Sequence, residues 1–203
     1  YAAARVLATQ SRRSDLSGPA LQAVHVEAGK YLADRWMDID PETLLELDTF
    51  GHVQGNRFHG EVTSSKVLIV PLMRGGEPLA RGVFDRFPHA SMVHCFEDDQ
   101  GKLVDNRLLK SLSTHTINHV VIVDSVINEG HSIRRVLDNV RGAAVDAPEF
   151  KISVLTLVMQ EAASLLLVKE YPGISFITLR ISKNKYKGKG GTDTGNRLFG
   201  TTM

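Results

Sequence analysis

Residues 124 to 132 have the types and the order of an anion-binding turn. The segment reads Asp124-Ser-Val-Ile-Asn-Glu-Gly130-His-Ser132 and follows the apolar run His119 to Val123. Backbone N–H groups at the start of a helix lack partners within it, and the helix dipole favours negative charge there. Gly130 lets the backbone approach a phosphate closely, and the Ser132 hydroxyl could cap the helix or bond a phosphate oxygen. An ordinary strand-to-helix turn with a serine cap remains the alternative on these residues alone.

A strand before this turn and a helix after it would hold it in place. After Ser132, the apolar residues recur at helical spacing, at Ile133, Val136, Leu137 and Val140. Asp124 then stands at the carboxyl end of a strand, which is where open α/β sheets bind their ligands. The pattern therefore predicts that the turn faces a ligand site.

The last two thirds of the chain alternate between short apolar runs and helical patterns. The expected strands are Val67 to Val70, Ser91 to Phe96, His119 to Val123, Ile152 to Met159 and Ile174 to Leu179, and the expected helices are Leu79 to Phe87, Ile133 to Val140 and Glu161 to Lys169. This alternation predicts an α/β fold with a mostly parallel central sheet flanked by helices. Ser182 to Gly195, rich in Lys and Gly, is expected to be a long loop, and such loops are often functional.

The first third of the chain predicts an N-terminal helix and a small β-hairpin. Apolar residues recur at helical spacing from Leu21 to Trp36, and Leu44 to Thr49 and Asn56 to Val62 flank a turn with two glycines. Because 203 residues can bury one sizeable core, we expect a single domain over residues 1–203. The first residue, Tyr1, also fits a processed chain or a piece of a longer polypeptide.

The composition excludes several classes of function. Lys and Arg number 24 and Asp and Glu 23, which gives a formal net charge of +1 and argues against nucleic-acid or membrane-surface binding by bulk charge. No apolar run approaches the roughly 20 residues that span a bilayer, and the given sequence does not open with a signal-peptide pattern. The single cysteine, Cys95, cannot form an internal disulfide, so we expect a buried thiol and a reducing, cytoplasmic setting.

Three stretches of the chain resemble the uracil phosphoribosyltransferase family, in the family's order. Val70-Pro-Leu-Met-Arg74-Gly-Gly-Glu-Pro-Leu79 is similar to the family's V-P-I-L-R-A-G-L-P-M, and the turn at Asp124 is similar to its D-P-M-L-A-T-G-G-S. The tail Gly190-Gly-Thr-Asp-Thr-Gly-Asn-Arg-Leu-Phe-Gly-Thr201 resembles G-L-G-D-A-G-D-R-L-F-G-T and is the most specific of the three. The resemblance runs from about Ser11 to Thr201 and implies the type I phosphoribosyltransferase fold.

The resemblance also implies a reaction. Ribose 5-phosphate would pass from phosphoribosyl pyrophosphate to uracil, giving UMP and pyrophosphate in pyrimidine salvage, with Mg²⁺ as cofactor and a homodimer or higher homo-oligomer as the working form. In such a transfer, positioning and charge stabilisation supply the rate.

The family's functional residues carry over by position. The catalytic residues would be Arg74, Asp124 and Asp193. The 5′-phosphate and ribose would be held by Asp124, Ser125, Val126, Ile127, Asn128, Glu129, Gly130, His131 and Ser132. Pyrophosphate would lie at Arg74 and Gly75, since a guanidinium suits bidentate contact with phosphate. The uracil side would be Tyr186, Lys187, Gly190, Gly191, Thr192 and Asp193, and no residue is assigned to a separate metal site.

The chain departs from the family at positions that would touch ligands. In the turn, the family's threonine is Glu129 and its second glycine is His131. A carboxylate beside a bound phosphate is repulsive unless it turns outward or pairs with His131, Arg134 or Arg135. The family's Y-I-V-P-G-L-G-D is here Tyr186-Lys-Gly-Lys-Gly-Gly-Thr-Asp193, which should hold an aromatic base less well and an anionic ligand better.

Two interpretations of these departures stay open. The chain is either an active, divergent uracil phosphoribosyltransferase or a non-catalytic relative with a binding, regulatory or assembly role, and a different nucleobase is a third, smaller option. The sequence leaves open which base is accepted.

Other residues suggest metal-binding or RNA-binding sites that the sequence does not favour. His52 and His59 lack cysteine partners and zinc-ligand spacing, so a surface role is expected. Glu97-Asp98-Asp99 stands where the family usually has an arginine and is expected to be a solvated turn. Lys183, Lys185, Lys187 and Lys189 are expected to line an anionic-ligand site or to be solvated, rather than to bind RNA.

Overall fold

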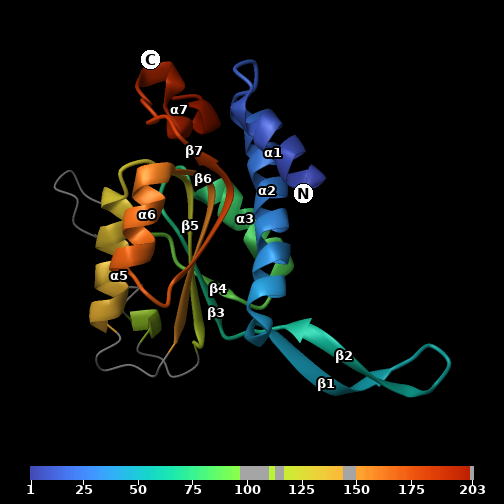
Figure 1. Cartoon of the computed structure of the whole chain (residues 1–203). Helices are drawn as coiled ribbons and strands as arrows, with labels where there is room; N and C mark the ends of the chain where they lie inside the picture. The colour runs from blue at the N-terminus through green and yellow to red at the C-terminus, as the bar shows by residue number, and fades with distance from the viewer. Residues whose placement is uncertain (97–109, 113–116, 144–149, 202–203) are drawn as a thin grey trace.

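Five parallel strands form a central sheet between two layers of helices in this computed structural model, which describes residues 1–96, 110–112, 117–143 and 150–201 (Figure 1). The strands are β3 (Val67–Pro71), β4 (Ser91–Met92), β5 (His119–Ile127), β6 (Lys151–Gln160) and β7 (Ser175–Ser182), in the order β4-β3-β5-β6-β7. The helices are α1 (Ala2–Arg12), α2 (Gly18–Ile39), α3 (Glu77–Arg86), α5 (His131–Ala143), α6 (Glu161–Glu170) and α7 (Thr194–Phe199). The predicted α/β fold with a mostly parallel sheet is therefore confirmed.

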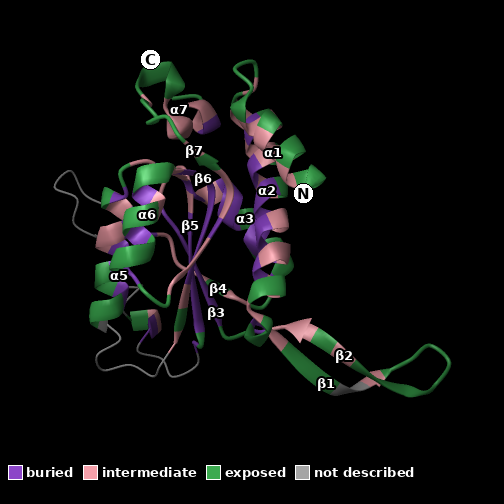
Figure 2. Cartoon of the chain, viewed as in Figure 1, coloured by how far each residue is buried: buried purple, intermediate pink, exposed green. Residues whose placement is uncertain are grey.

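Successive residues of the central strands point into two separate cores. On β3, Leu68 and Val70 belong to the core that contains α5 and α6, whereas Val67 and Ile69 pack with residues of α2 and α3. Figure 2 shows the central strands coloured as buried, with helices on either side that carry buried stretches. Burial on both faces explains why these strands read as continuous apolar runs rather than as alternating patterns.

The small hairpin projects away from the sheet. Its strands, β1 (Leu44–Gly51) and β2 (Arg57–Thr63), pair antiparallel after a short 3₁₀ turn at Pro41–Thr43 (Figure 1). Phe50 and Phe58 stack with their ring centroids 5.4 Å apart. The predicted hairpin and the predicted first helix, now α2, are both present.

Some predicted boundaries were wrong. The regular part of β4 is only two residues, although the chain runs beside β3 as far as Cys95, which pairs with Leu72 in an isolated bridge. Strand β5 is longer than predicted and ends at Ile127, because it pairs with β6 along most of its length. Helix α1 escaped prediction because it buries no residue completely.

Strand β5 therefore includes the first four residues of the anion-binding turn. Its extension matters for the site because it fixes Asp124 and Ser125 on a rigid element. Cys95 is buried, as expected. No helix within the described ranges has the length and apolar character needed to cross a membrane.

Candidate active site

The candidate site lies where β3 and β5 separate at their carboxyl ends. Because β3 connects to β4 on one side and β5 connects to β6 on the other, the connections that leave β3 and β5 diverge and leave a crevice between them. A Cβ atom at Gly76 would lie 2.2 Å from the Val123 carbonyl oxygen, so the turn after β3 approaches β5 as only glycine permits. The Ser125 hydroxyl donates a hydrogen bond to the Gly75 carbonyl oxygen (2.5 Å).

Arg74 is held in this crevice by the C-terminal tail. Its guanidinium donates to the Thr201 hydroxyl (3.1 Å) and to the Asn196 side-chain oxygen (3.0 Å), and the Thr201 hydroxyl also donates to Asn196 (2.8 Å). These partners are neutral, so the positive charge of Arg74 stays available to an anion. The role of Asn196 and Thr201 was not predicted, although both lie in the tail motif that resembled the family most closely.

The tail itself is anchored to the N-terminal helices. Arg197 donates to the carbonyl oxygens of Arg13 (2.6 Å) and Leu16 (2.9 Å), and Gln22 donates to the Leu198 carbonyl oxygen (2.7 Å). Gly200 ends α7 in the left-handed conformation, with φ at 64°. The tail motif therefore has a structural role, since it fixes the guanidinium of Arg74.

Asp124 and residues 126–133 line a hollow of about 240 Å³ at the start of α5. Gly130 has φ at 80°, which lets the chain turn sharply into the helix that begins at His131. Ser132 is thus the second residue of the helix rather than its cap, because the helix starts two residues before the expected Ile133. The alternative that its hydroxyl bonds a phosphate oxygen stays a prediction. The hollow and the free N–H groups of a helix start suit a phosphate.

Glu129 is neutralised by its neighbours. Its carboxylate pairs with the Lys185 ammonium (3.0 Å) and with the His131 ring (3.2 Å), whereas Arg134 contacts only its backbone carbonyl oxygen. Hydrogen bonding to Lys185, followed by the charge of that lysine, lowers the pKa of Glu129. Pairing with His131 was anticipated, while Lys185 comes from the lysine-rich segment and was not.

Asn128 ties the phosphate turn to the opposite wall of the crevice. Its side-chain amide donates to the Tyr186 carbonyl oxygen and accepts from the Tyr186 N–H, both at 2.9 Å. The Tyr186 hydroxyl in turn bonds Thr192 and Thr194. The segment from Tyr186 to Asp193, predicted to be part of a long loop, is therefore internally braced and contains a 3₁₀ turn at Gly190–Thr192.

A central cleft of about 370 Å³ gathers eight of the seventeen predicted site residues. Arg74, Gly75, Asp124, Ser125, Val126, Asn128, Tyr186 and Asp193 line it. Gly188, within the segment expected to form the uracil side, also lines the cleft, and Met73, Thr194 and Gly195 line it without having been predicted. Lys187, Gly190, Gly191 and Thr192 do not line it. The acidic run at 97–99 lies outside the described residues.

Carboxylate oxygens suit a magnesium ion in the central cleft. Asp124 and Asp193 both line it, and Mg²⁺ is usually bound by one or two carboxylates together with substrate phosphates. One Asp193 oxygen accepts the Asn196 N–H at the start of α7 (2.8 Å), which orients the carboxylate. The donor set therefore fits the ion that the resemblance implies.

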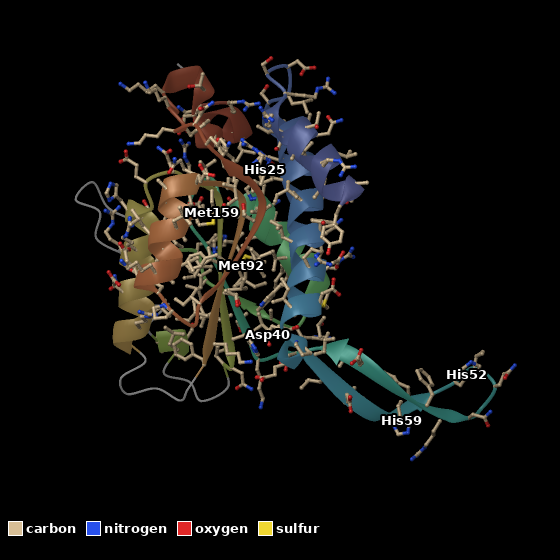
Figure 3. The ribbon with its side chains drawn as sticks, viewed as in Figure 1. His25, Asp40, His52, His59, Met92 and Met159 are labelled. Atoms are coloured by element: carbon tan, nitrogen blue, oxygen red, sulfur yellow. The ribbon has the colours of Figure 1, made fainter. Side chains whose placement is uncertain are left out.

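A second group of possible metal ligands lies at the other end of the sheet. Asp40, Glu42 and His119 have ligand atoms within 4.8 Å of one another, but Lys151 already pairs with both carboxylates. Figure 3 shows Asp40 near the base of the hairpin, far along α2 from His25 at the end near α7. His52 and His59 lie out on the hairpin, as their predicted surface role requires.

Comparison with known families agrees with this geometry. The sequence model described as uracil phosphoribosyltransferase matches residues 2–201. The chain belongs to the uracil phosphoribosyltransferase family. The match covers the phosphate turn, the Arg74 turn and the tail, so the resemblance noted from three motifs extends over nearly the whole chain.

Solved structures show the same fold at low sequence identity. The AQ2163 protein of Aquifex aeolicus superposes with a TM-score of 0.76 at 15% identity, covering 98% of this chain and 95% of that one. The hypoxanthine phosphoribosyltransferase of Trypanosoma cruzi gives a TM-score of 0.51 at 12% identity, with 81% of each chain covered. These likenesses place this member of the uracil phosphoribosyltransferase family in the type I phosphoribosyltransferase fold.

Proposed function

We propose that the chain transfers ribose 5-phosphate from phosphoribosyl pyrophosphate to uracil and produces UMP and pyrophosphate. The observation that carries the proposal is the central cleft, where Arg74, Asp124 and Asp193 come together from three distant segments. The family match supports phosphoribosyl transfer to a nucleobase, and uracil is the base that the family's description names.

Each part of the cleft has a task in this reaction. The bond from C1′ of the ribose to pyrophosphate breaks, a bond from C1′ to a ring nitrogen of the base forms, and the proton of that nitrogen is released. Arg74, held by neutral partners, would stabilise charge on the leaving pyrophosphate. The start of α5 would hold the 5′-phosphate, and Asn128 would fix the distance between the phosphate turn and Tyr186.

Magnesium would be held by Asp124 and Asp193 together with the pyrophosphate oxygens. When bound, it would neutralise negative charge on the diphosphate, a Lewis-acid role. The contribution of this chain is to keep the two carboxylates on the rigid β5 and at the start of α7.

The pairing of Glu129 supports the active interpretation over the non-catalytic one. An unpaired carboxylate in the phosphate turn would repel the 5′-phosphate, but Lys185 and His131 both contact it. The homo-oligomer and the cytoplasmic setting remain predictions, and light scattering of the purified chain would test the first.

The direct test is UMP formation from uracil and phosphoribosyl pyrophosphate with Mg²⁺. Purified protein should form UMP and lose this activity with excess EDTA. The matched variants are Asp193→Asn, which should reduce turnover strongly, and Asp138→Asn on α5, outside the cleft, which should not. If folded protein forms no nucleotide from any of several bases, the non-catalytic interpretation takes the place of this one.

A further inference from the structure

A side cavity of about 240 Å³ adjoins the central cleft on the side of α1 and α2. The two share Ser125, Val126, Tyr186 and Thr194, so a ligand in the central cleft can extend into the side cavity. A nucleotide has three parts, and three hollows meet around Val126. The turn suits the phosphate and the central cleft suits the ribose and pyrophosphate, which leaves the side cavity for the ring.

The floor of the side cavity is apolar. It includes Leu21 from α2, Val126 from β5, and Leu157 and Val158 from β6. Strand pairing places Val126, Val158 and Arg180 in one row across β5, β6 and β7. A flat ring lying on this row would have its inner edge near the ribose site and its outer edge near Arg180.

Two arginines at the outer end of the cavity have no anionic partner. Arg12 lies at the end of α1 and Arg180 lies on β7, and neither guanidinium forms a hydrogen bond or an ion pair with any described residue. Among the described residues that line the cavity, none is acidic. By contrast, Arg35, Arg81, Arg86 and Arg134 each pair with a carboxylate.

The positive charges of Arg12 and Arg180 are not balanced by any described acidic residue of the cavity. Burial lowers the pKa of Arg180, and the positive charge of Arg12 lowers it further. Two like charges at a partly buried site repel each other, and an anion between them would remove the repulsion and form charge-assisted hydrogen bonds. The third arginine that lines the cavity, Arg197, is already committed to two backbone carbonyl oxygens.

His25 supplies a neutral group at the same cavity. Its Nδ1 lies 2.9 Å from the Leu21 carbonyl oxygen, which can only accept, so Nδ1 carries the proton and Nε2 is an acceptor. Burial lowers the pKa of His25 to about 4, so the ring is neutral at pH 7. The cavity thus combines an apolar floor, one acceptor for a ring N–H and two cations.

We propose that the side cavity binds an acceptor base whose ring carries a carboxylate, and that Arg12 and Arg180 hold this carboxylate. The inference rests on the proposed phosphoribosyl transfer and extends it from uracil to carboxylated uracil. The bonds that form and break at C1′ are unchanged, because the carboxylate takes no part in the reaction. Its role is to orient the ring.

The test compares uracil with uracil-5-carboxylate and uracil-6-carboxylate as acceptors. The unaltered protein should use at least one carboxylated base with a kcat/KM at or above that for uracil. Arg180→Met should lower kcat/KM for that base about 10- to 100-fold, since a hydrogen bond to a charged group is lost, and should change the value for uracil less than about 2-fold. Arg12→Met, on the exposed end of α1, should act in the same direction.

A matched control is Arg57→Met on the exposed hairpin, which removes the same charge and should affect neither base. Turnover of uracil without turnover of either carboxylated base would overturn the proposal, as would an equal loss for both bases in Arg180→Met. If no base is turned over at all, the proposed function is wrong, and calorimetry with uracil-6-carboxylate and phosphoribosyl pyrophosphate decides the inference separately. Binding that Arg180→Met abolishes supports it, whereas equally tight binding of inorganic phosphate alone contradicts it.

Discussion

The two ends of the parallel sheet carry similar kinds of side chains in different states of pairing. At the amino-terminal end of the strands, Lys151 contacts both Asp40 and Glu42, and the His119 ring lies 3.3 Å from Asp40. At the carboxyl end, no acidic residue in the described part of the chain pairs with Arg12 or Arg180, and the described partners of the Arg74 side chain are neutral. The carboxylates of the first set are paired with a cation, whereas the cations of the second set have no anionic partner among the described residues.

That difference shows which end of the sheet is built for ligands. A paired network has little to gain from an added ion, whereas unpaired cations in a cleft gain the full interaction with an incoming anion. We therefore expect the possible metal ligands at Asp40 to serve the junction between α2 and the hairpin, and we propose that the magnesium implied by the family binds at the other end. Pairing state, rather than residue type, separates the two regions.

The largest expected effect is at Arg74. Arg74→Met should lower kcat/KM at least about 100-fold, because a preorganised donor to the leaving group is lost. Arg81→Met on α3 removes an exposed arginine that is paired with Glu77 and should leave activity unchanged. Steady-state kinetics with phosphoribosyl pyrophosphate as the varied substrate checks both, and equal activity of the two variants would break the contrast between unpaired and paired charges.

Acid should weaken the fold more through His25 than through His119. Burial lowers the pKa of both rings, but the Asp40 carboxylate opposes the shift only at His119. Because the folded pKa of His25 is about 4 and the unfolded value is about 6.5, the unfolded state binds more protons between these values, and stability falls as the pH falls. At pH 5 the loss from His25 should be about 2 kcal/mol.

Urea unfolding at pH 7.5 and pH 5.0 checks this difference. His25→Asn should remove most of the acid sensitivity, since an amide does not titrate and can still donate to the Leu21 carbonyl oxygen. His119→Asn is the matched variant and should remove less of it. A larger effect of His119→Asn would mean that His119, rather than His25, contributes most to the acid sensitivity.

Lys185 should matter for substrate binding through Glu129. Lys185→Met leaves the Glu129 carboxylate with only His131 beside the phosphate turn, so the KM for phosphoribosyl pyrophosphate should rise roughly three- to ten-fold. The double variant Lys185→Met with Glu129→Thr should recover the original KM. Lys183→Met, in the same segment, is the control, and a rise in KM with that variant would point to general charge rather than to the pair.

The smallest effect is expected at the amino-terminal end of the strands. Lys151→Met should change the free energy of unfolding by less than about 1 kcal/mol, because the ammonium is half exposed and its ion pairs are screened by water. Activity should not change. A loss of activity with unchanged stability would mean that Lys151 affects the central cleft. It would contradict the view that only the carboxyl end of the sheet serves ligand binding.

Sequence patterns predicted the elements that have strong periodicity. The runs at Val67, His119 and Ile152 became β3, β5 and β6, and the helix after Ser132 became α5, because burial on fixed faces leaves a regular apolar signature. Helices α1 and α7 left weaker signatures, since the first buries no residue completely and the second has only six residues. Their positions depend on contacts with α2 and with Arg74, which no local pattern records.

The sequence by itself determined the parts of this protein that depend on local residue types. The phosphate turn, the Arg74 turn and the tail motif could be found because glycine, acid and arginine stand at fixed spacings. Tertiary structure alone decided which charges are paired, because pairing depends on distances between segments far apart in the chain. It joined Lys185 to Glu129 and the tail to Arg74, and it placed Arg12 and Arg180 at one cavity where no described residue supplies an anion.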